Sequence, residues 1–310
     1  MQYLILIAGF VLLIKGADFF VDGSSGLAKR LRVPTMIIGL TVVAMGTSLP
    51  ETAVSVSASL AGKNDLAVSN AVGSNIFNLM IVCGISAIIA PMAIKKSTLF
   101  KEFPFSIIIS GLLLLFGVTG GIIDRWEGIL MLTLFIGFLL YTVFAARRAR
   151  RADDTEEDTK ALKPLWLCLI FIVGGATAIA FGGRFVVDSA SKIARSFGIS
   201  DNVIGLTIVA LGTSLPELFT SIVAAKRGET DIALGNVIGS NIFNILFVLG
   251  IATTISPIAF VTENIIDCIA LIAMSLLTMV FCSTKLTLGR WEGAVMVTSY
   301  TAYILYITFR

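Results

Sequence analysis

Two stretches of the chain combine a proline, small hydroxyl residues and a glutamate inside strongly apolar surroundings. Residues 39–51 read GLTVVAMGTSLPE and residues 205–217 read GLTIVALGTSLPE, with ten of the last twelve positions identical. A carboxylate in hydrocarbon costs about 2.5–3.5 kcal/mol on insertion scales, and a proline leaves a helix carbonyl without its hydrogen-bond partner. These residue types at membrane depth indicate that Glu51 and Glu217, together with the freed oxygens, bind a cation.

A second pair of repeated segments adds neutral oxygen ligands. Residues 70–91 and 236–257 are identical at twelve of 22 positions, and each contains the motif GSNIFN. Asn78 and Asn244 offer amide oxygens, and Ser74 shares a helix face with Asn78, four residues later. The other candidate ligands are hydroxyl groups of Ser74, Ser240, Thr47, Ser48, Thr213 and Ser214, and backbone carbonyls near Ala44, Thr47, Ala210 and Thr213.

All these candidate ligand atoms are oxygens, which selects hard cations over soft ones. Calcium accepts about six to eight oxygens in irregular geometry, so two carboxylates, two amide oxygens and two carbonyls would satisfy it. Two carboxylates neutralise one Ca²⁺ or two Na⁺. Competition of the two ions for one anionic centre would therefore couple their movements.

The overall composition describes a membrane protein. The chain has 310 residues, of which 56% are hydrophobic and only 14% charged. Histidine is absent, which excludes histidine dyads, histidine proton relays and histidine-bound zinc. The four cysteines lie in apolar segments without paired spacing, as packing residues do. Because no nucleophile–base pair is recognisable, we expect a protein that is not an enzyme. We also expect that it needs no cofactor and binds no nucleic acid.

Ten apolar segments approach the length of about 20 residues that crosses a bilayer. They lie at residues 2–20, 34–60, 66–91, 102–121, 126–146, 164–188, 202–225, 231–257, 264–283 and 291–309. Sixteen Lys and Arg residues fall in the loops on one side, and five fall on the other. The positive-inside rule makes the side with sixteen cytoplasmic, so both termini are expected outside.

The repeated motifs belong to a longer internal duplication. GADFFVDG at 16–23 aligns with GGRFVVDS at 182–189, and DRWEG at 124–128 aligns with GRWEG at 289–293. Each half holds five spans, an odd number, so the second half crosses the membrane in the opposite sense. The sequence predicts an all-α polytopic membrane protein of two inverted five-helix repeats, 1–146 and 164–310. Their broken helices would meet at the midplane, and residues 147–163 would form a cytoplasmic linker.

The paired GTSLPE and GSNIFN motifs resemble the α-repeats of the sodium/calcium exchanger family, within the calcium/cation antiporter superfamily. The resemblance covers essentially the whole chain, including the short central loop typical of prokaryotic members. It implies Na⁺-driven, electrogenic Ca²⁺ exchange by alternating access, with the first and sixth spans sliding over a rigid core. Because one chain supplies both halves of the site, we expect it to function as a single chain. The compact loop and the lack of a targeting segment indicate a prokaryotic plasma membrane, with lipid around the protein.

The resemblance also assigns ligands by motif position. It implies a calcium site of Glu51, Glu217 and Asn78 with the carbonyls of Thr47 and Thr213. The sodium sites would be completed by Ser48, Ser214, Ser74, Ser240, Ala44 and Ala210, beside the two glutamates. Some members carry Asp where this chain has Asn244. The centre here therefore has at most two negative charges, which leaves the Na⁺:Ca²⁺ ratio and any role of K⁺ or H⁺ open.

Three alternatives remain open at this point. A K⁺-dependent Na⁺/Ca²⁺ exchanger shares the general motif. A Ca²⁺/H⁺ exchanger is similar in architecture, but such relatives typically show a GN-x-x-E-H-type second motif, where this chain has NAVGSN and no histidine. A cation channel also uses carboxylates and carbonyls, although its filter usually comes from the rings of an oligomer.

Overall fold

The computed structural model describes residues 1–62, 65–152, 162–199, 204, 208 and 210–309. Almost all of the regular structure in these residues is helical, in agreement with the predicted class. The elements up to the linker are α1 (Gln2–Leu31), α2 (Thr35–Ile38), the π-helical turn η1 (Gly39–Val43), α3 (Ala44–Thr47), α4 (Leu49–Leu60), α5 (Asp65–Phe77), η2 (Asn78–Cys83), α6 (Gly84–Ile89), β1 (Met92–Ala93), η3 (Thr98–Glu102), α7 (Phe103–Gly120), β2 (Ile122–Ile123) and α8 (Arg125–Ala152). Those after it are α9 (Leu165–Ser196), α11 (Ala210–Gly212), α12 (Leu215–Lys226), α13 (Thr230–Phe243), η6 (Asn244–Leu249), α14 (Gly250–Ile255), β3 (Ile258–Ala259), α15 (Thr262–Lys285), β4 (Thr287–Leu288) and α16 (Arg290–Phe309).

Seven of the described helices are long and apolar enough to cross a membrane, and an eighth span results if the bent pair Thr35–Thr47 and Leu49–Leu60 counts as one. Two predicted spans are not among these eight. One is α16, which is helical over 20 residues but carries several hydroxyl side chains. The other, predicted at 202–225, lies partly outside the described residues, as do 205–207 and 209 of the second motif and 153–161 of the linker.

Helices α1 and α9 are longer than the predicted spans 2–20 and 164–188, and end at Leu31 and Ser196. Residues 21–31 and 189–196, which follow the predicted spans within these helices, contain no proline. Their small and apolar residues continue to pack, so nothing ends the helix there. Helix α8 likewise continues to Ala152, into the segment predicted as linker.

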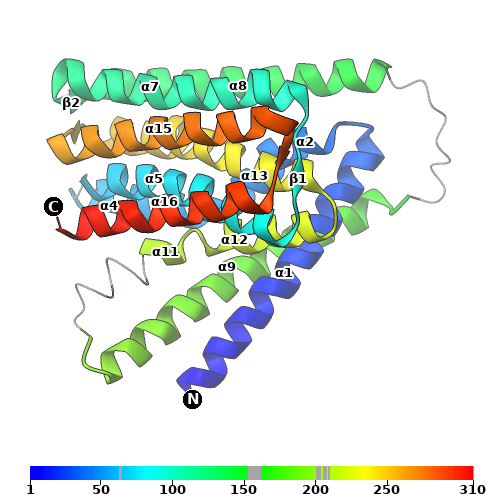
Figure 1. The fold of residues 1–310 in the computed structure, drawn as a ribbon, viewed down its shortest axis with the longest axis horizontal. Helices are drawn as coiled ribbons and strands as arrows, with labels where there is room; N and C mark the ends of the chain where they lie inside the picture. The colour runs from blue at the N-terminus through cyan, green and yellow to red at the C-terminus, as the bar shows by residue number, and fades with distance from the viewer. Residues whose placement is uncertain (63–64, 153–161, 200–203, 205–207, 209, 310) are drawn as a thin grey trace.

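The pair formed by α1 and α9 packs through glycines spaced by seven residues. Gly9, Gly16 and Gly23 of α1 face Gly182, Gly175 and the backbone near Cys168 of α9. A methyl group at any of these three positions of α1 would lie 3.0 Å or closer to backbone atoms of α9. Figure 1 shows the two helices crossing the other helices at an angle, while α7, α8, α15 and α16 run roughly parallel. Close backbone approach through small residues is the usual way in which membrane helices associate.

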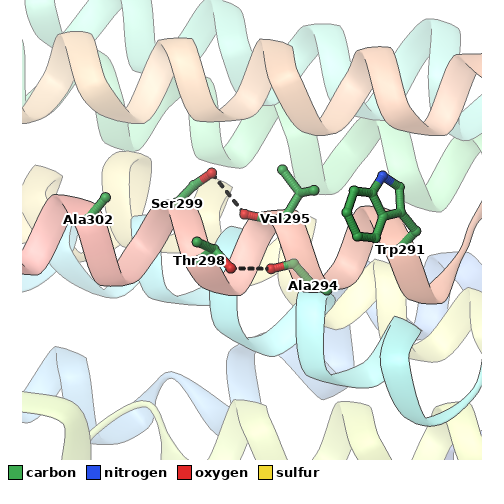
Figure 2. Close-up of a pocket in the computed structure, with 6 residues that line it drawn as sticks. All are labelled: Trp291, Ala294, Val295, Thr298, Ser299 and Ala302. Atoms are coloured by element: carbon green, nitrogen blue, oxygen red, sulfur yellow. Dashed lines mark hydrogen bonds between the residues drawn. The ribbon is translucent and has the colours of Figure 1, made fainter.

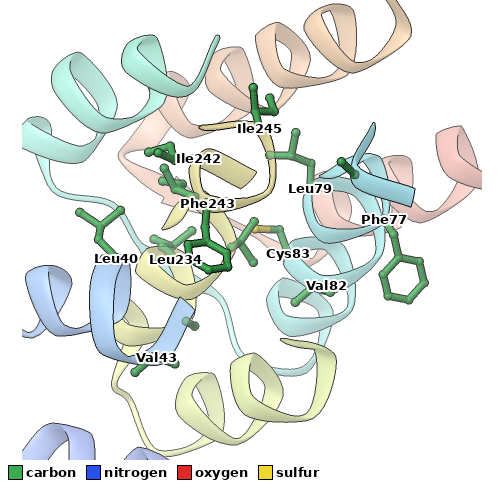
Figure 3. Packing of buried hydrophobic residues seen from close by; sticks show 14 of the residues in the cluster. Leu40, Val43, Phe77, Leu79, Val82, Cys83, Leu234, Ile242, Phe243 and Ile245 are labelled. Atoms are coloured by element: carbon green, nitrogen blue, oxygen red, sulfur yellow. The ribbon is translucent and has the colours of Figure 1, made fainter. Parts of the chain in front are cut away.

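The centre of the molecule is formed by the two segments that carry the GSNIFN motifs. The most apolar stretches of Leu66–Ile89 and Thr230–Ile255 are 72% and 94% buried, against 22–33% for the other spans that pass the length and hydropathy test. Apolar side chains of η1, η2, α13 and η6 fill the space around them (Figure 3). These are Leu40, Val43, Leu79, Val82, Cys83, Leu234, Ile242, Phe243 and Ile245. The motif-bearing helices are therefore the most deeply buried of these spans.

Two short antiparallel strand pairs connect loops that are distant in sequence. Strand β1 pairs with β4, with Met92 opposite Leu288, and β2 pairs with β3, with Ile123 opposite Ile258. Each pair joins a loop before the linker to a loop after it. The two parts of the chain are thus tied together at two places besides their helix packing.

We predict that Gly175→Ala lowers the thermal stability of the protein, whereas Gly174→Ala does not. A Cβ atom at Gly175 would lie 2.6 Å from the backbone nitrogen of Phe20, whereas a Cβ at Gly174 meets no atom within 4 Å. Overpacking of this kind costs about 1–3 kcal/mol, and the two variants gain the same helix propensity. Thermal denaturation of the purified variants in detergent measures the difference. Equal melting temperatures would show that α1 and α9 are not in close contact there.

Candidate cation-binding site

The two GTSLPE motifs form breaks between short helices. Helix α3 ends at Thr47, Ser48 has φ −88° and ψ 14°, and α4 starts at Leu49 after a bend of 50°. In the second motif, Ser214 has φ −93° and ψ 5° and precedes α12. Each new helix has its proline in the first turn, where a missing N–H costs nothing. The glutamate follows in that same turn, near the positive end of the helix dipole.

The serine before each new helix does not cap that helix with its side chain. Instead, Ser48 Oγ donates a hydrogen bond of 2.8 Å to Glu217, and Ser214 Oγ lies 3.2 Å from Glu51, so each hydroxyl reaches the glutamate of the other motif. Ser214 also bonds Ser74 at 3.2 Å, and Ser240 bonds Glu217 at 3.5 Å. A serine in this position normally caps its own helix. Here each serine hydroxyl instead forms a hydrogen bond that connects the two motifs.

Glu51 and Glu217 are both completely buried. Among the described residues, no lysine or arginine forms an ion pair with either carboxylate. In each glutamate, the oxygen Oε2 has no hydrogen-bond partner in the described part of the chain. Buried charges in proteins are paired or coordinate metal ions. The two carboxylates therefore have the chemistry of a cation site.

Asn78 and Asn244 are the first residues of the π-helical turns η2 and η6, and both are completely buried. Within the described residues, the side-chain oxygen Oδ1 of each has no partner. Their amide groups donate hydrogen bonds to Asn241 and Asn75. π-Helical turns are rare and frequently mark functional sites. The two asparagines thus add two bare amide oxygens to the two bare carboxylate oxygens.

The remaining predicted ligands lie along the same breaks. Thr47 and Thr213 lie beside Glu217 and Glu51, and the hydroxyl of Thr47 bonds the carbonyl of Ala44 at 3.2 Å. The Ala44 carbonyl also accepts the N–H of Ser48, so it is not left free by the break. Ala210 is the first residue of α11, directly before the second break.

Two residues that the sequence did not single out support the broken helices. The side-chain amide of Asn236 donates to the Glu217 carbonyl at 3.3 Å and to Ser221 at 3.0 Å. Asn70 does the same for the Glu51 carbonyl and Ser55, at 3.4 and 3.0 Å. Asn236 also accepts a bond from Thr47. The signal for them was available, because an asparagine opens both aligned segments, NAVGSN and NVIGSN.

A surface groove of about 380 Å³ lies elsewhere, along α16. Figure 2 shows its lining by Trp291, Ala294, Val295, Thr298, Ser299 and Ala302. The hydroxyls of Thr298 and Ser299 bond carbonyls of their own helix at 2.9 Å. No acidic side chain lines this groove, so it lacks the ligands of a cation site.

Comparisons with known proteins match nearly the whole chain. The family described as sodium/calcium exchanger protein matches residues 1–144 and 166–309. The sodium/calcium exchanger MaX1 of Methanosarcina acetivorans is 34% identical over 345 residues, covering 99% of both chains. The inner membrane protein YrbG of Escherichia coli is 40% identical, covering 82% of this chain and 79% of its own. Among solved structures, the sodium-calcium exchanger NCX_Mj soaked with 10 mM Na⁺ and zero Ca²⁺ superposes with a TM-score of 0.87 at 35% identity, covering 98% of both chains.

We predict that Ca²⁺ or Na⁺ raises the melting temperature of the purified protein above that in choline chloride of equal ionic strength. A ligand that binds only the folded state at a hundredfold excess over its Kd stabilises it by about 2.7 kcal/mol. The variant Glu51→Gln should lose the Ca²⁺ effect, because one of the two buried charges is gone. Glu263→Gln, at an exposed glutamate of α15, is the matched control and should retain the effect. A Ca²⁺ effect that survives Glu51→Gln would place the ion elsewhere.

Proposed function

Because this chain belongs to the sodium/calcium exchanger family, we propose that it is a secondary antiporter that exchanges Na⁺ for Ca²⁺ across a membrane. Family membership confirms the resemblance carried by the GTSLPE and GSNIFN motifs, and exchangers are transporters, not enzymes. The prokaryotic relatives and the apolar helices support an integral membrane protein of a prokaryotic plasma membrane.

One observation carries the proposal for the ion site. Four buried oxygens without a partner in the described chain occur at matching positions of the two motif pairs: Oε2 of Glu51 and Glu217, and Oδ1 of Asn78 and Asn244. Two carboxylates and two amides suit Ca²⁺, which prefers oxygen ligands. We assign these four residues to the calcium site, with the carbonyls of Thr47 and Thr213 completing it.

Sodium would bind the same two carboxylates, on the side where the serine hydroxyls lie. Four serines, namely Ser48, Ser214, Ser74 and Ser240, hydrogen-bond to Glu51 or Glu217 or to each other. Their hydroxyls therefore lie where Na⁺ can be held next to the same charges. Ala210 would contribute its backbone carbonyl. Ala44 would contribute its own only after that carbonyl gives up a hydrogen bond from Thr47 or Ser48. Since two carboxylates balance one Ca²⁺ or two Na⁺, binding of one ion type excludes the other. This exclusion is the physical basis of coupled exchange.

Alternating access requires that the ions reach the buried site from each side in turn. The α1–α9 pair is packed tightly within itself by glycines and lies across the helices of the core (Figure 1). It is therefore suited to move as one body. We propose that it slides over the core and exposes the site to one side of the membrane at a time.

We further propose ten spans arranged as two inverted five-helix repeats, 1–146 and 164–310, with the termini outside. The strand pairs support this topology, since β1 and β4 both fall in loops predicted to be cytoplasmic, and β2 and β3 both fall in loops predicted to be outside. Ion pairs agree as well: Lys95 bonds Asp231 at 2.5 Å, and Lys163 pairs with Asp22. Each of these pairs joins segments at the predicted cytoplasmic side.

Labelling of single introduced cysteines tests the orientation. The four native cysteines are buried, so they should give little background with a membrane-impermeant maleimide. We expect Arg125→Cys to react in intact cells, and Lys96→Cys to react only after the membrane is opened. The reverse pattern would invert the proposed topology.

The exchange itself is tested in vesicles that contain the purified protein. With Na⁺ inside and Na⁺-free buffer outside, we expect uptake of radioactive Ca²⁺ that stops when the Na⁺ gradient is collapsed. Glu51→Gln and Glu217→Gln should each abolish the uptake, because a charge needed to balance Ca²⁺ is removed. Glu263→Gln is again the control and should transport normally.

The alternatives predict other outcomes in the same vesicles. Uptake that follows a pH gradient and ignores Na⁺ would identify a Ca²⁺/H⁺ exchanger, and a requirement for K⁺ beside Na⁺ would identify the K⁺-dependent type. Flux that needs no opposing gradient and far exceeds the turnover of a carrier would identify a channel.

A further inference from the structure

We propose that Asn75 and Asn241 are positioning residues, which fix the side-chain amides of Asn244 and Asn78 so that each presents its oxygen to the cation site. This inference rests on the proposed calcium site. It concerns a feature of asparagine that a carboxylate does not share. One end of the amide attracts a cation, and the other end, the NH₂ group, repels it.

The two ligand amides are constrained through their nitrogen ends. Asn244 Nδ2 donates to Asn75 Oδ1 at 3.1 Å, and Asn78 Nδ2 donates to Asn241 Oδ1 at 3.3 Å. The opposite ends, Oδ1 of Asn78 and of Asn244, have no partner in the described chain. Within the completely buried surroundings of both residues, the amide orientation is therefore set by one neighbouring side chain in each case.

The two positioning residues are in turn oriented by the main chain. Asn75 Nδ2 donates to the backbone carbonyl of Asn241 at 3.1 Å, and Asn241 Nδ2 donates to that of Asn75 at 3.2 Å. A carbonyl can only accept a hydrogen bond, so it binds the nitrogen end of each amide. The side-chain oxygen of each positioning residue then points away from that backbone carbonyl and toward the ligand amide. Because this oxygen can only accept a hydrogen bond, it binds the nitrogen end of the ligand amide. The backbone thus determines, through two steps, which end reaches the ion.

These contacts cross between the two halves of the chain. Asn75 orients the ligand that belongs to the other GSNIFN motif, and Asn241 does the reverse. The ligand amides of the cation site are consequently oriented toward the ion only when α5 and α13 pack in this register. Partners behind the ligands of a metal site are usually worth a factor of about 10–100 in affinity.

A double-variant cycle separates positioning from packing. An aspartate has two equivalent oxygens and needs no orientation, so Asn244→Asp should make the site independent of Asn75. We expect Asn75→Ala to raise the KM for Ca²⁺ by about 10- to 100-fold in Na⁺-loaded vesicles, with the maximal rate less affected. In the Asn244→Asp background, Asn75→Ala should leave the KM within about threefold or lower it, because the oxygen of Asn75 would there face another oxygen.

The symmetric cycle uses Asn241→Ala with Asn78→Asp and should give the same pattern. Asn264→Ala, at a buried asparagine of α15, is the matched control and should leave the KM unchanged. The chromatographic elution profile and the melting temperature in the absence of cations show whether each variant is folded. An equal rise in KM in both backgrounds, or failure of Asn75→Ala to fold in either, would assign Asn75 to helix packing and overturn the proposal. Absence of exchange in the unchanged protein would instead refute the proposed function.

Discussion

Two carboxylates buried without a basic partner are the constraint on which the structure depends. Glu51 and Glu217 are fully enclosed, and no lysine or arginine of the described chain pairs with them. An uncompensated buried charge is strongly unfavourable. Since no basic side chain compensates these carboxylates, the surrounding groups must allow a cation to bind next to them. The prolines that break the helices, the serines at the breaks and the asparagines of the π-helical turns all serve this requirement.

The site is built by exchange of contacts between the two halves. Ser48 and Ser214 do not cap their own helices but donate hydrogen bonds to the glutamate of the opposite motif. Asn75 and Asn241 bond reciprocally through side chain and backbone. Neither half therefore has a complete set of oriented oxygens by itself. This explains why the motif-bearing helices are the most buried spans, whereas the α1–α9 pair lies across the rest of the molecule.

Much of this was predictable because helices in a membrane obey strict rules. Apolar length predicts where helices cross, and a glutamate next to a proline in such a segment marks a functional site. The predicted ends of α1 and α9 were wrong, because both helices continue about ten residues beyond the predicted spans. The apolar stretch of the sequence ends at the membrane surface, whereas a helix ends only where its backbone hydrogen bonds end. Asn70 and Asn236 were missed because their role is to bond the main chain of another helix.

The sequence alone determined the residue types of the site, the membrane class of the chain and the repetition of the motifs, because these depend on composition, spacing and self-similarity. Only the tertiary structure decided which hydroxyl serves which glutamate and which end of each asparagine is left bare. Those choices depend on hydrogen bonds between residues about 160–170 positions apart. No local pattern encodes such bonds, since they exist only after the helices have packed.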